Sequence, residues 1–266
     1  MEFGIFSLEF FVSMEIYTLI ILCFAAFAAG FVDAVVGGGG LIQTPVALIV
    51  FPKESVATLI GTLKIPAFSG TSMAARQYVR QVALKLHLLL LMGTLAFCAA
   101  FFGSWTLTQV NNAFMKPVLF IVLIGIALYT FIKKDFGQTA QKSHTDRELL
   151  LYGVLLSLVV GFYDGFIGPG TGSFLVLGFI VVLGFDFLQA SAHAKIVNLA
   201  TNLGSILLFT LKGKIIWTLA LPMALANALG GWLGAKTAIA KGNQFIRKVF
   251  LIVVIGTLLR FAWDIF

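Results

Sequence analysis

Six apolar stretches, each about 20 residues long, decide what this chain can fold into. They cover residues 16–36, 86–105, 113–132, 149–167, 215–235 and 246–265. A helix of about 20 apolar residues is long enough to cross the hydrocarbon core of a bilayer. The residue types AVILMFWYC make up 60% of the chain, and so many apolar side chains cannot all be hidden from solvent inside a soluble protein. The sequence therefore predicts an all-α polytopic membrane protein.

The formal charge of +7 does not indicate nucleic-acid binding in such a protein. Lys and Arg of membrane proteins gather in loops, where they attract anionic lipid head groups. We therefore expect membrane lipid, and no nucleic acid, as a partner. Cys23 and Cys98 lie in apolar stretches without metal-ligand spacing, so neither a metal site nor a cofactor is predicted.

The two halves of the sequence match without a gap. Asp33 falls on Asp164, a shift of 164 − 33 = 131 residues, and the same shift places Lys64 on Lys195. Low apolar complexity produces chance matches of Leu and Ile, but it does not place Asp, Lys and several Gly in register. We predict two internal repeats. The predicted organisation is a first transmembrane repeat at 1–132, a cytoplasmic linker at 133–148 and a second transmembrane repeat at 149–266.

Basic residues suggest how the repeats are oriented. They gather in three clusters: Arg76, Arg80 and Lys85; Lys133, Lys134, Lys142 and Arg147; and Lys236, Lys241, Arg247 and Lys248. The positive-inside rule places all three in the cytoplasm, which makes the repeats inverted, as in many secondary transporters. Lys212 and Lys214 would then lie outside, so a parallel arrangement stays open.

A cluster of glycines interrupts each half at an equivalent place. The first is Gly37, Gly38, Gly39 and Gly40, and the second runs Gly168, Pro169, Gly170, Thr171, Gly172 and Ser173. Consecutive glycines disfavour a helix by about 1 kcal/mol each relative to Ala, so each helix should break here. The apolar runs that follow, 41–51 and 174–185, are too short to span. They are expected to be half-helices that enter the membrane and return.

The start of such a half-helix is suited to an anion. Its free N–H groups carry partial positive charge, and glycine lets a ligand approach the backbone closely. Thr171 and Ser173 could add hydroxyl donors. The alternative is that the glycines only permit a turn or tight helix packing. Neither cluster has the Lys-Ser/Thr that follows a P-loop, which excludes a nucleotide site of that kind.

Ionisable residues inside the membrane are expensive and usually have a partner or a function. Lys64 and Lys195 lie in polar helices that follow the two breaks, and Asp33 and Asp164 precede the breaks. On the helix of Lys195, one face carries the polar residues Asn198 and Asn202, with Thr201 beside it and His193 nearby. The lysines, Asn198, Thr201 and Asn202 are candidate substrate ligands.

Other roles for these residues stay open. Asp33 and Asp164 could form buried ion pairs with the lysines that hold the halves together. They could also cap the broken backbone or carry a coupling proton. His193 could donate to the substrate or pair with nearby backbone.

The motifs GFVDAVVGGGGLIQTP and GFYDGFIGPGTGSF, each followed by a Lys-bearing polar helix, resemble those of the TauE/SafE family of sulfite exporter-like permeases. The resemblance covers residues from about 16 to 265. It implies a multi-pass transporter of the bacterial inner membrane that exports sulfite, organosulfonates or related sulfur oxyanions. It places the family's paired motifs on Asp33 with Gly37 to Gly40, and on Asp164 with Gly168 to Gly172.

The function expected is secondary transport by alternating access around an anion site at the membrane midplane. A passive anion channel is the alternative within transport. A membrane-embedded enzyme is disfavoured, because the chain has no H-E-x-x-H or G-x-S-x-G motif and no Cys–His arrangement. Coupling to a proton or another ion and assembly into a homo-oligomer are left open by the sequence.

Overall fold

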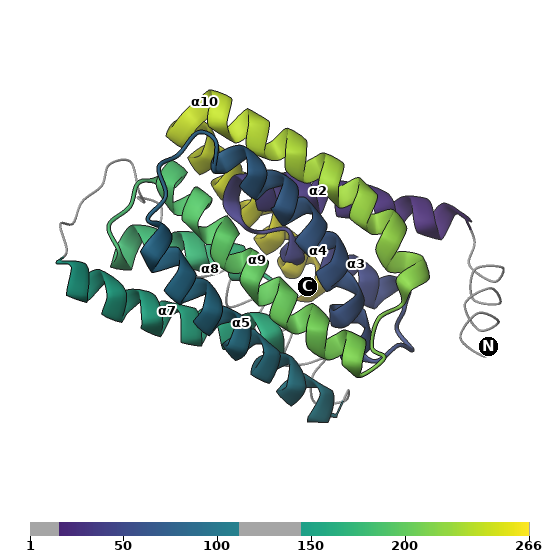
Figure 1. Cartoon of the computed structure of the whole chain (residues 1–266). Coiled ribbons are helices and arrows are strands. Elements are labelled where there is room, and N and C mark those ends of the chain that lie inside the picture. The colour runs from purple at the N-terminus through teal and green to yellow at the C-terminus, as the bar shows by residue number, and fades with distance from the viewer. Residues whose placement is uncertain (1–15, 112–144, 266) are drawn as a thin grey trace.

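The computed structural model describes residues 16–111 and 145–265, and every regular element in these ranges is helical. The elements are α2 (Ile16–Val36), α3 (Gly40–Val50), α4 (Val56–Tyr78), α5 (Leu86–Gln109), α7 (Asp146–Phe166), α8 (Thr171–Leu177), the π-helix η1 (Gly178–Val182), α9 (Phe187–Leu211) and α10 (Trp217–Ile265). The expected span at 113–132 and most of the linker at 133–148 lie outside these ranges. Figure 1 shows the helices packed as one bundle.

Five described helices are long and apolar enough to cross a membrane, which confirms the prediction of an all-α polytopic membrane protein. They are Ile16–Val36, Leu86–Gln109, Arg147–Phe166, Phe187–Leu211 and Trp217–Gly242. Phe187–Leu211 was not counted among the apolar stretches, because it carries Lys195, Asn198 and Asn202, which the fold buries. The helix of α10 kinks at Gly242, whose φ is 67°, and continues to Ile265.

Helix α7 begins at Asp146, inside the predicted linker. Thr145 accepts a hydrogen bond from the backbone of Glu148, and the Glu148 carboxylate accepts one from the backbone of Thr145. This capping box satisfies N–H groups that have no partner within the helix. The second half therefore starts a few residues earlier than its apolar stretch.

Both glycine clusters interrupt the helices as predicted. Helix α2 ends at Val36 and α3 starts at Gly40, while α7 ends at Phe166 and α8 starts at Thr171. Gly37, Gly168 and Gly170 have φ of 82°, 89° and 84°, a left-handed conformation that glycine adopts without a Cβ penalty. The helices that follow, Gly40–Val50 and Thr171–Val182, are too short to span the bilayer.

Helices related by the shift of 131 residues run in opposite directions. The pairs α3 and α8, α4 and α9, and α5 and α10 start at residues 40 and 171, 56 and 187, and 86 and 217, so each pair differs by 131. Helix α4 starts beside the α9–α10 connection, where Ile216 N donates to Thr62 Oγ1 at 3.0 Å. Helix α9 starts beside the α4–α5 connection, where Lys85 N donates to His193 Nε2 at 3.1 Å. The two helices are therefore antiparallel (Figure 1), as an inverted repeat requires, and the duplication itself stays a prediction.

The two halves interlock through α5 and α10. Helix α10 packs on α2 and α4 of the first half, and α5 packs on α7 and α9 of the second. Glycines allow this close approach: a Cβ at Gly103 would overlap the Phe162 carbonyl, and one at Gly234 would overlap the Phe31 carbonyl. Small residues at helix contacts are the usual means of tight packing in membranes.

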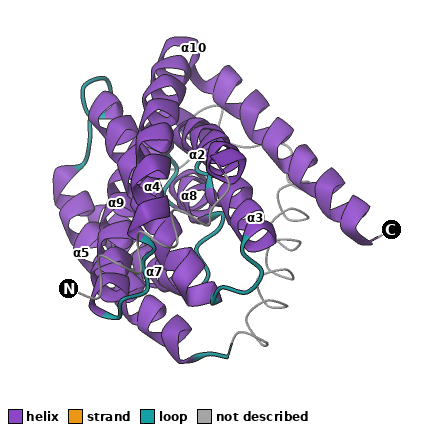
Figure 2. Ribbon diagram, turned by 90° about the vertical axis from the view of Figure 1, so that its right-hand side faces the viewer, coloured by secondary structure: helices purple, strands orange, loops and turns teal. Residues whose placement is uncertain are grey.

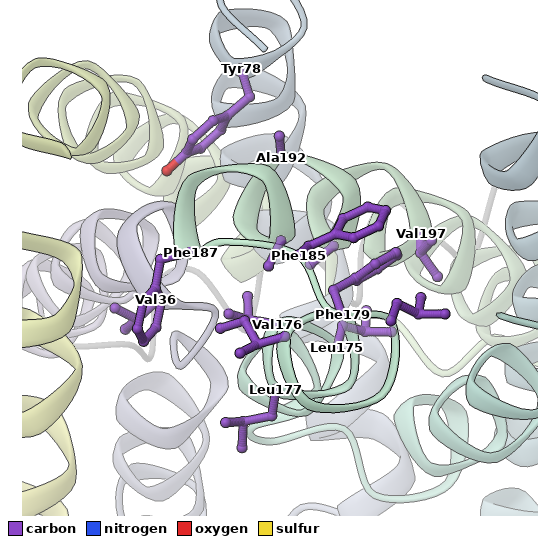
Figure 3. Close-up of a cluster of buried hydrophobic side chains, with 14 of the residues drawn as sticks. Val36, Tyr78, Leu175, Val176, Leu177, Phe179, Phe185, Phe187, Ala192 and Val197 are labelled. Atoms are coloured by element: carbon purple, nitrogen blue, oxygen red, sulfur yellow. The ribbon is translucent and has the colours of Figure 1, made fainter. Parts of the chain in front are cut away.

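The short second half-helix is at the centre of the apolar core. Viewed as in Figure 2, α8 lies near the middle of the bundle, surrounded by longer helices. Figure 3 shows Leu175, Val176 and Phe179 in the cluster of buried side chains that also includes Val36 and Phe187. The core thus holds the second glycine break in place against the end of α2.

Candidate anion site

The two glycine breaks meet inside the bundle and border a cavity of about 50 Å³. This volume has room for a few water molecules or one small oxyanion. The cavity is lined by Asp33, Gly37, Gly40, Gln43, Thr44, Ile60, Leu63, Lys64, Ala67, Asp164, Gly168, Pro169, Gly170, Thr171, Gly172, Asn198 and Asn202. Residues 131 positions apart thus face the same space from both halves.

Direct backbone contact joins the two breaks. Ser173 N donates to Gly37 O at 2.9 Å, and Ser173 Oγ donates to Val36 O at 3.1 Å. A Cβ on Gly37 would overlap the backbone of Gly172, and a Cβ on Gly172 would overlap that of Gly37. Only glycine at both positions lets the starts of the two short helices come this close.

Two ion pairs, one buried and one partly buried, cross between the halves. Lys64 Nζ lies 2.8 Å from Asp164 Oδ1, and Lys195 Nζ lies 2.9 Å from Asp33 Oδ2. Each ammonium also donates to the backbone carbonyl of the same aspartate. Each lysine therefore neutralises the acid of the other half and donates to a backbone carbonyl near the end of the interrupted helix. The ion pairs considered from the sequence are present in the structure.

The two pairs differ in how their carboxylates are satisfied. Asp33 Oδ2 accepts from Lys195 and from Thr71 Oγ1, the latter at 3.2 Å. Asp164 Oδ2 is buried and has no hydrogen-bond partner among the described residues, and the same is true of Asn202 Nδ2. Both of these residues line the cavity. Two lining residues of the second half therefore carry a buried acceptor and a buried donor without a partner among the described residues.

Most of the residues that the sequence singled out come together at this cavity. Those that line it are Asp33, Gly37, Gly40, Lys64, Asp164, Gly168, Gly170, Thr171, Gly172, Asn198 and Asn202. Those outside the lining are Gly38, Gly39, Ser173, His193, Lys195 and Thr201. The first set contains one lysine and both aspartates.

The residues behind the lining support it. Gly39 faces α2, because a Cβ there would lie 2.6 Å from Ala29 O and 2.7 Å from Asp33 Cβ. Thr201 Oγ1 donates to Asn198 O and lies 3.2 Å from Asn198 Oδ1, so it holds the asparagine in position. The expected hydroxyl donors are occupied, since Thr171 Oγ1 donates to Gly168 O and Ser173 Oγ donates to Val36 O.

Comparison with known proteins decides the family. Residues 22–261 match the family described as "Sulfite exporter TauE/SafE". The chain belongs to the TauE/SafE family. The resemblance of its two glycine motifs to this family is thereby confirmed, and in this chain residues of both motifs line the cavity described above.

Relatives in the TauE/SafE family are named as membrane transporters. "Probable membrane transporter protein ORF9" of a Sinorhizobium species is 36% identical, covering 94% of this chain and 95% of the relative. A "Probable membrane transporter protein" of Haemophilus influenzae is 35% identical, with 92% and 95% covered, and YfcA of Escherichia coli K12 is 34% identical, with 88% and 85% covered. No solved structure matches the chain. The protein is a membrane transporter and not an enzyme.

Sequence reasoning missed several polar residues of this family member's site. Gln43 and Thr44 line the cavity from the first turn of α3. Asn227, a single amide in an apolar stretch, donates to Gln43 Oε1 at 3.3 Å. Their position in the sequence could have indicated them, because side chains just after a glycine break lie close to the cavity that the break borders.

His193 is separated from the cavity lining and is satisfied elsewhere. Its ring accepts from Lys85 N, contacts Gln189 O at 2.8 Å and packs 4.7 Å from the Phe185 ring. We expect His193→Gln to leave anion affinity unchanged and to lower stability by about 1–3 kcal/mol, because a buried hydrogen bond is weakened. Anion titration and thermal melting of the purified variant measure the two effects. A loss of affinity without a loss of stability would contradict this placement.

Proposed function

We propose that this transporter carries a small sulfur oxyanion or sulfonate through the cavity between the two glycine breaks, by alternating access. The observation that carries the proposal is the composition of the cavity wall. Lys64, Asn198 and Asn202 face the same space as the starts of both short helices. An ammonium, amide groups and helix N-termini are the donors that proteins use for oxyanions.

Binding would replace interactions that the lining residues make with one another. Lys64 is paired with Asp164, so an anion competes with the carboxylate for the ammonium. Both groups are buried, since Lys64 and Asp164 are 5% and 2% exposed. Electrostatic interactions are stronger in such surroundings than in water, which favours a specific contact with an anion over a diffuse one.

The antiparallel arrangement of the halves suits alternating access. From the central cavity, α3 runs toward the Lys53 loop, and α8 with η1 runs toward Phe185 and His193 at the opposite end. Rocking of one half against the other could then open the cavity to one side at a time. We place the end with Arg76, Lys85 and Lys236 in the cytoplasm by the positive-inside rule, which also suits an inner-membrane location.

Thermal stability of the purified protein in detergent tests the substrate class. Sodium salts of sulfite, thiosulfate, sulfate and methanesulfonate should be compared with sodium chloride at equal ionic strength. A bound anion at about 100 times its Kd adds about 2.7 kcal/mol of stability. We expect at least one sulfur anion to raise the melting temperature and chloride to leave it unchanged. Equal effects of all salts would contradict the proposal.

Flux measurements separate a transporter from a passive channel. In proteoliposomes, a transporter should show saturable uptake and counterflow, in which unlabelled substrate inside drives accumulation of labelled substrate. A channel would equilibrate the label without accumulation. The family description gives the direction of transport as export. To test this in cells, the amount of substrate retained should be compared between cells with and without the protein.

A further inference from the structure

Two residues of the cavity lining each carry a buried polar atom without a hydrogen-bond partner. Asp164 Oδ2 and Asn202 Nδ2 have no hydrogen-bond partner among the described residues, although each residue is only 2% exposed. Buried polar groups in folded proteins are nearly always paired, so an acceptor and a donor without partners on two residues that line one cavity point to a ligand.

In the first half, the two equivalent residues are hydrogen-bonded to each other. Thr71 is the equivalent of Asn202 under the shift of 131 residues, and Thr71 Oγ1 donates to Asp33 Oδ2. The equivalent bond from Asn202 to Asp164 is not made, and both atoms remain open. The first half therefore makes this hydrogen bond and the second half does not. The two residues that leave it unmade, Asp164 and Asn202, line the cavity.

We propose that Asp164 binds the proton that accompanies the transported anion. This inference rests on the proposed anion function. One proton from water binds Asp164 Oδ2, and the protonated carboxyl then donates to an anion oxygen that also accepts from Asn202 Nδ2. No covalent bond of the anion changes. Proton and anion leave together on the other side, so the cotransport of a monoanion moves no net charge.

Charge around the cavity favours this arrangement. When Asp164 is ionised, it neutralises the charge of Lys64. An ionised carboxylate has only acceptor atoms, so it repels an anion at the same cavity. Protonation leaves the Lys64 charge for the anion and adds a donor. The other charged groups at the cavity are Asp33 and, behind it, Lys195, which neutralise each other. Tyr163 beside Asp164 donates to Pro169 O, and the α9 residues of the lining are uncharged.

The test uses methanesulfonate, whose own charge does not change between about pH 5 and 8. Titration calorimetry of wild-type protein should show affinity that rises as pH falls, approaching about tenfold per pH unit. Asp164→Asn should bind with affinity independent of pH, because its amide keeps an acceptor for Lys64 and places a permanent donor beside the anion. Two buffers with different heats of ionisation should report about one proton taken up per anion by the wild type and none by the variant.

A matched variant excludes another titrating group. His193→Gln removes a buried histidine, the residue type whose ordinary pKa lies in this pH range, and the variant should keep the wild-type pH dependence. Thermal melting and elution as a single species establish that each variant is folded.

Each outcome has a distinct meaning. Wild-type binding without pH dependence, or an Asp164→Asn variant with the wild-type dependence and proton uptake, would overturn the role of Asp164 and leave the anion site standing. Failure of the wild type to bind methanesulfonate, sulfite or thiosulfate at any pH would remove the proposed function as well. If Asp164→Asn does not fold, proton uptake by the wild type decides, and a value of zero overturns the proposal.

Discussion

Lys64→Met combined with Asp164→Asn is expected to fold and to lose anion binding, with affinity lowered by about 10- to 100-fold. A hydrogen bond from a charged group contributes about 1.5–3 kcal/mol, which corresponds to that range. Lys64 is the only lysine in the cavity lining of the described chain, so no other ammonium can replace it there. Calorimetric titration with methanesulfonate measures the change.

The matched control is Lys195→Met combined with Asp33→Asn. It removes the equivalent ion pair, but Lys195 lies behind the lining, so affinity should stay within a few-fold of wild type. Each lysine changed alone should lower stability by about 3–5 kcal/mol, because an unpaired acid remains buried. Equal loss of binding by the two double variants would show that the ion pairs maintain the fold and that Lys64 has no special role at the anion.

Gly172→Ala is expected to stop transport and to lower the free energy of unfolding by about 1–3 kcal/mol, the usual cost of overpacking. The added Cβ would overlap the Gly37 backbone and separate the two glycine breaks. The hydrogen bond from Ser173 N to Gly37 O would lengthen or break with them. Melting temperature and uptake into proteoliposomes measure the two effects.

Gly93→Ala is the matched control for this change. Gly93 is also a helical glycine, but a Cβ there would only come within 3.6 Å of Ala200 Cβ, an ordinary contact. Alanine favours a helix over glycine by about 1 kcal/mol, so the control should be neutral or slightly more stable, with normal transport. Normal transport by Gly172→Ala would mean that the close contact of the breaks is not needed.

The elements of this fold that could be predicted are those whose structure is determined by the residues of the segment itself. A run of about 20 apolar residues forms a membrane helix wherever it occurs, and consecutive glycines break one. Helix α9 was harder to recognise as a span, because Lys195 and Asn202 lower its hydropathy and only tertiary packing buries them.

The candidate site was predictable as a set of residues and not as an arrangement. The ionisable residues and the glycine motifs stood out in the sequence, since each is unfavourable in a membrane helix without a partner or a role. Spacing along the chain could not show that Gly39 and Lys195 lie behind the cavity wall and His193 away from it, while Gln43 and Thr44 form part of the wall. Those positions follow from the angle at which each broken helix meets the other half.

By itself, the sequence determined that this protein is a helical membrane transporter of the TauE/SafE family, with two interruptions in its helices. Hydropathy, glycine content and motif identity are local properties that do not depend on which helices touch. Only the tertiary structure decided that Lys64 pairs with Asp164 and Lys195 with Asp33, and that one buried carboxylate oxygen of Asp164 has no partner among the described residues. The reason is that these contacts join residues about 100 or more positions apart, whose meeting depends on how the antiparallel halves interlock.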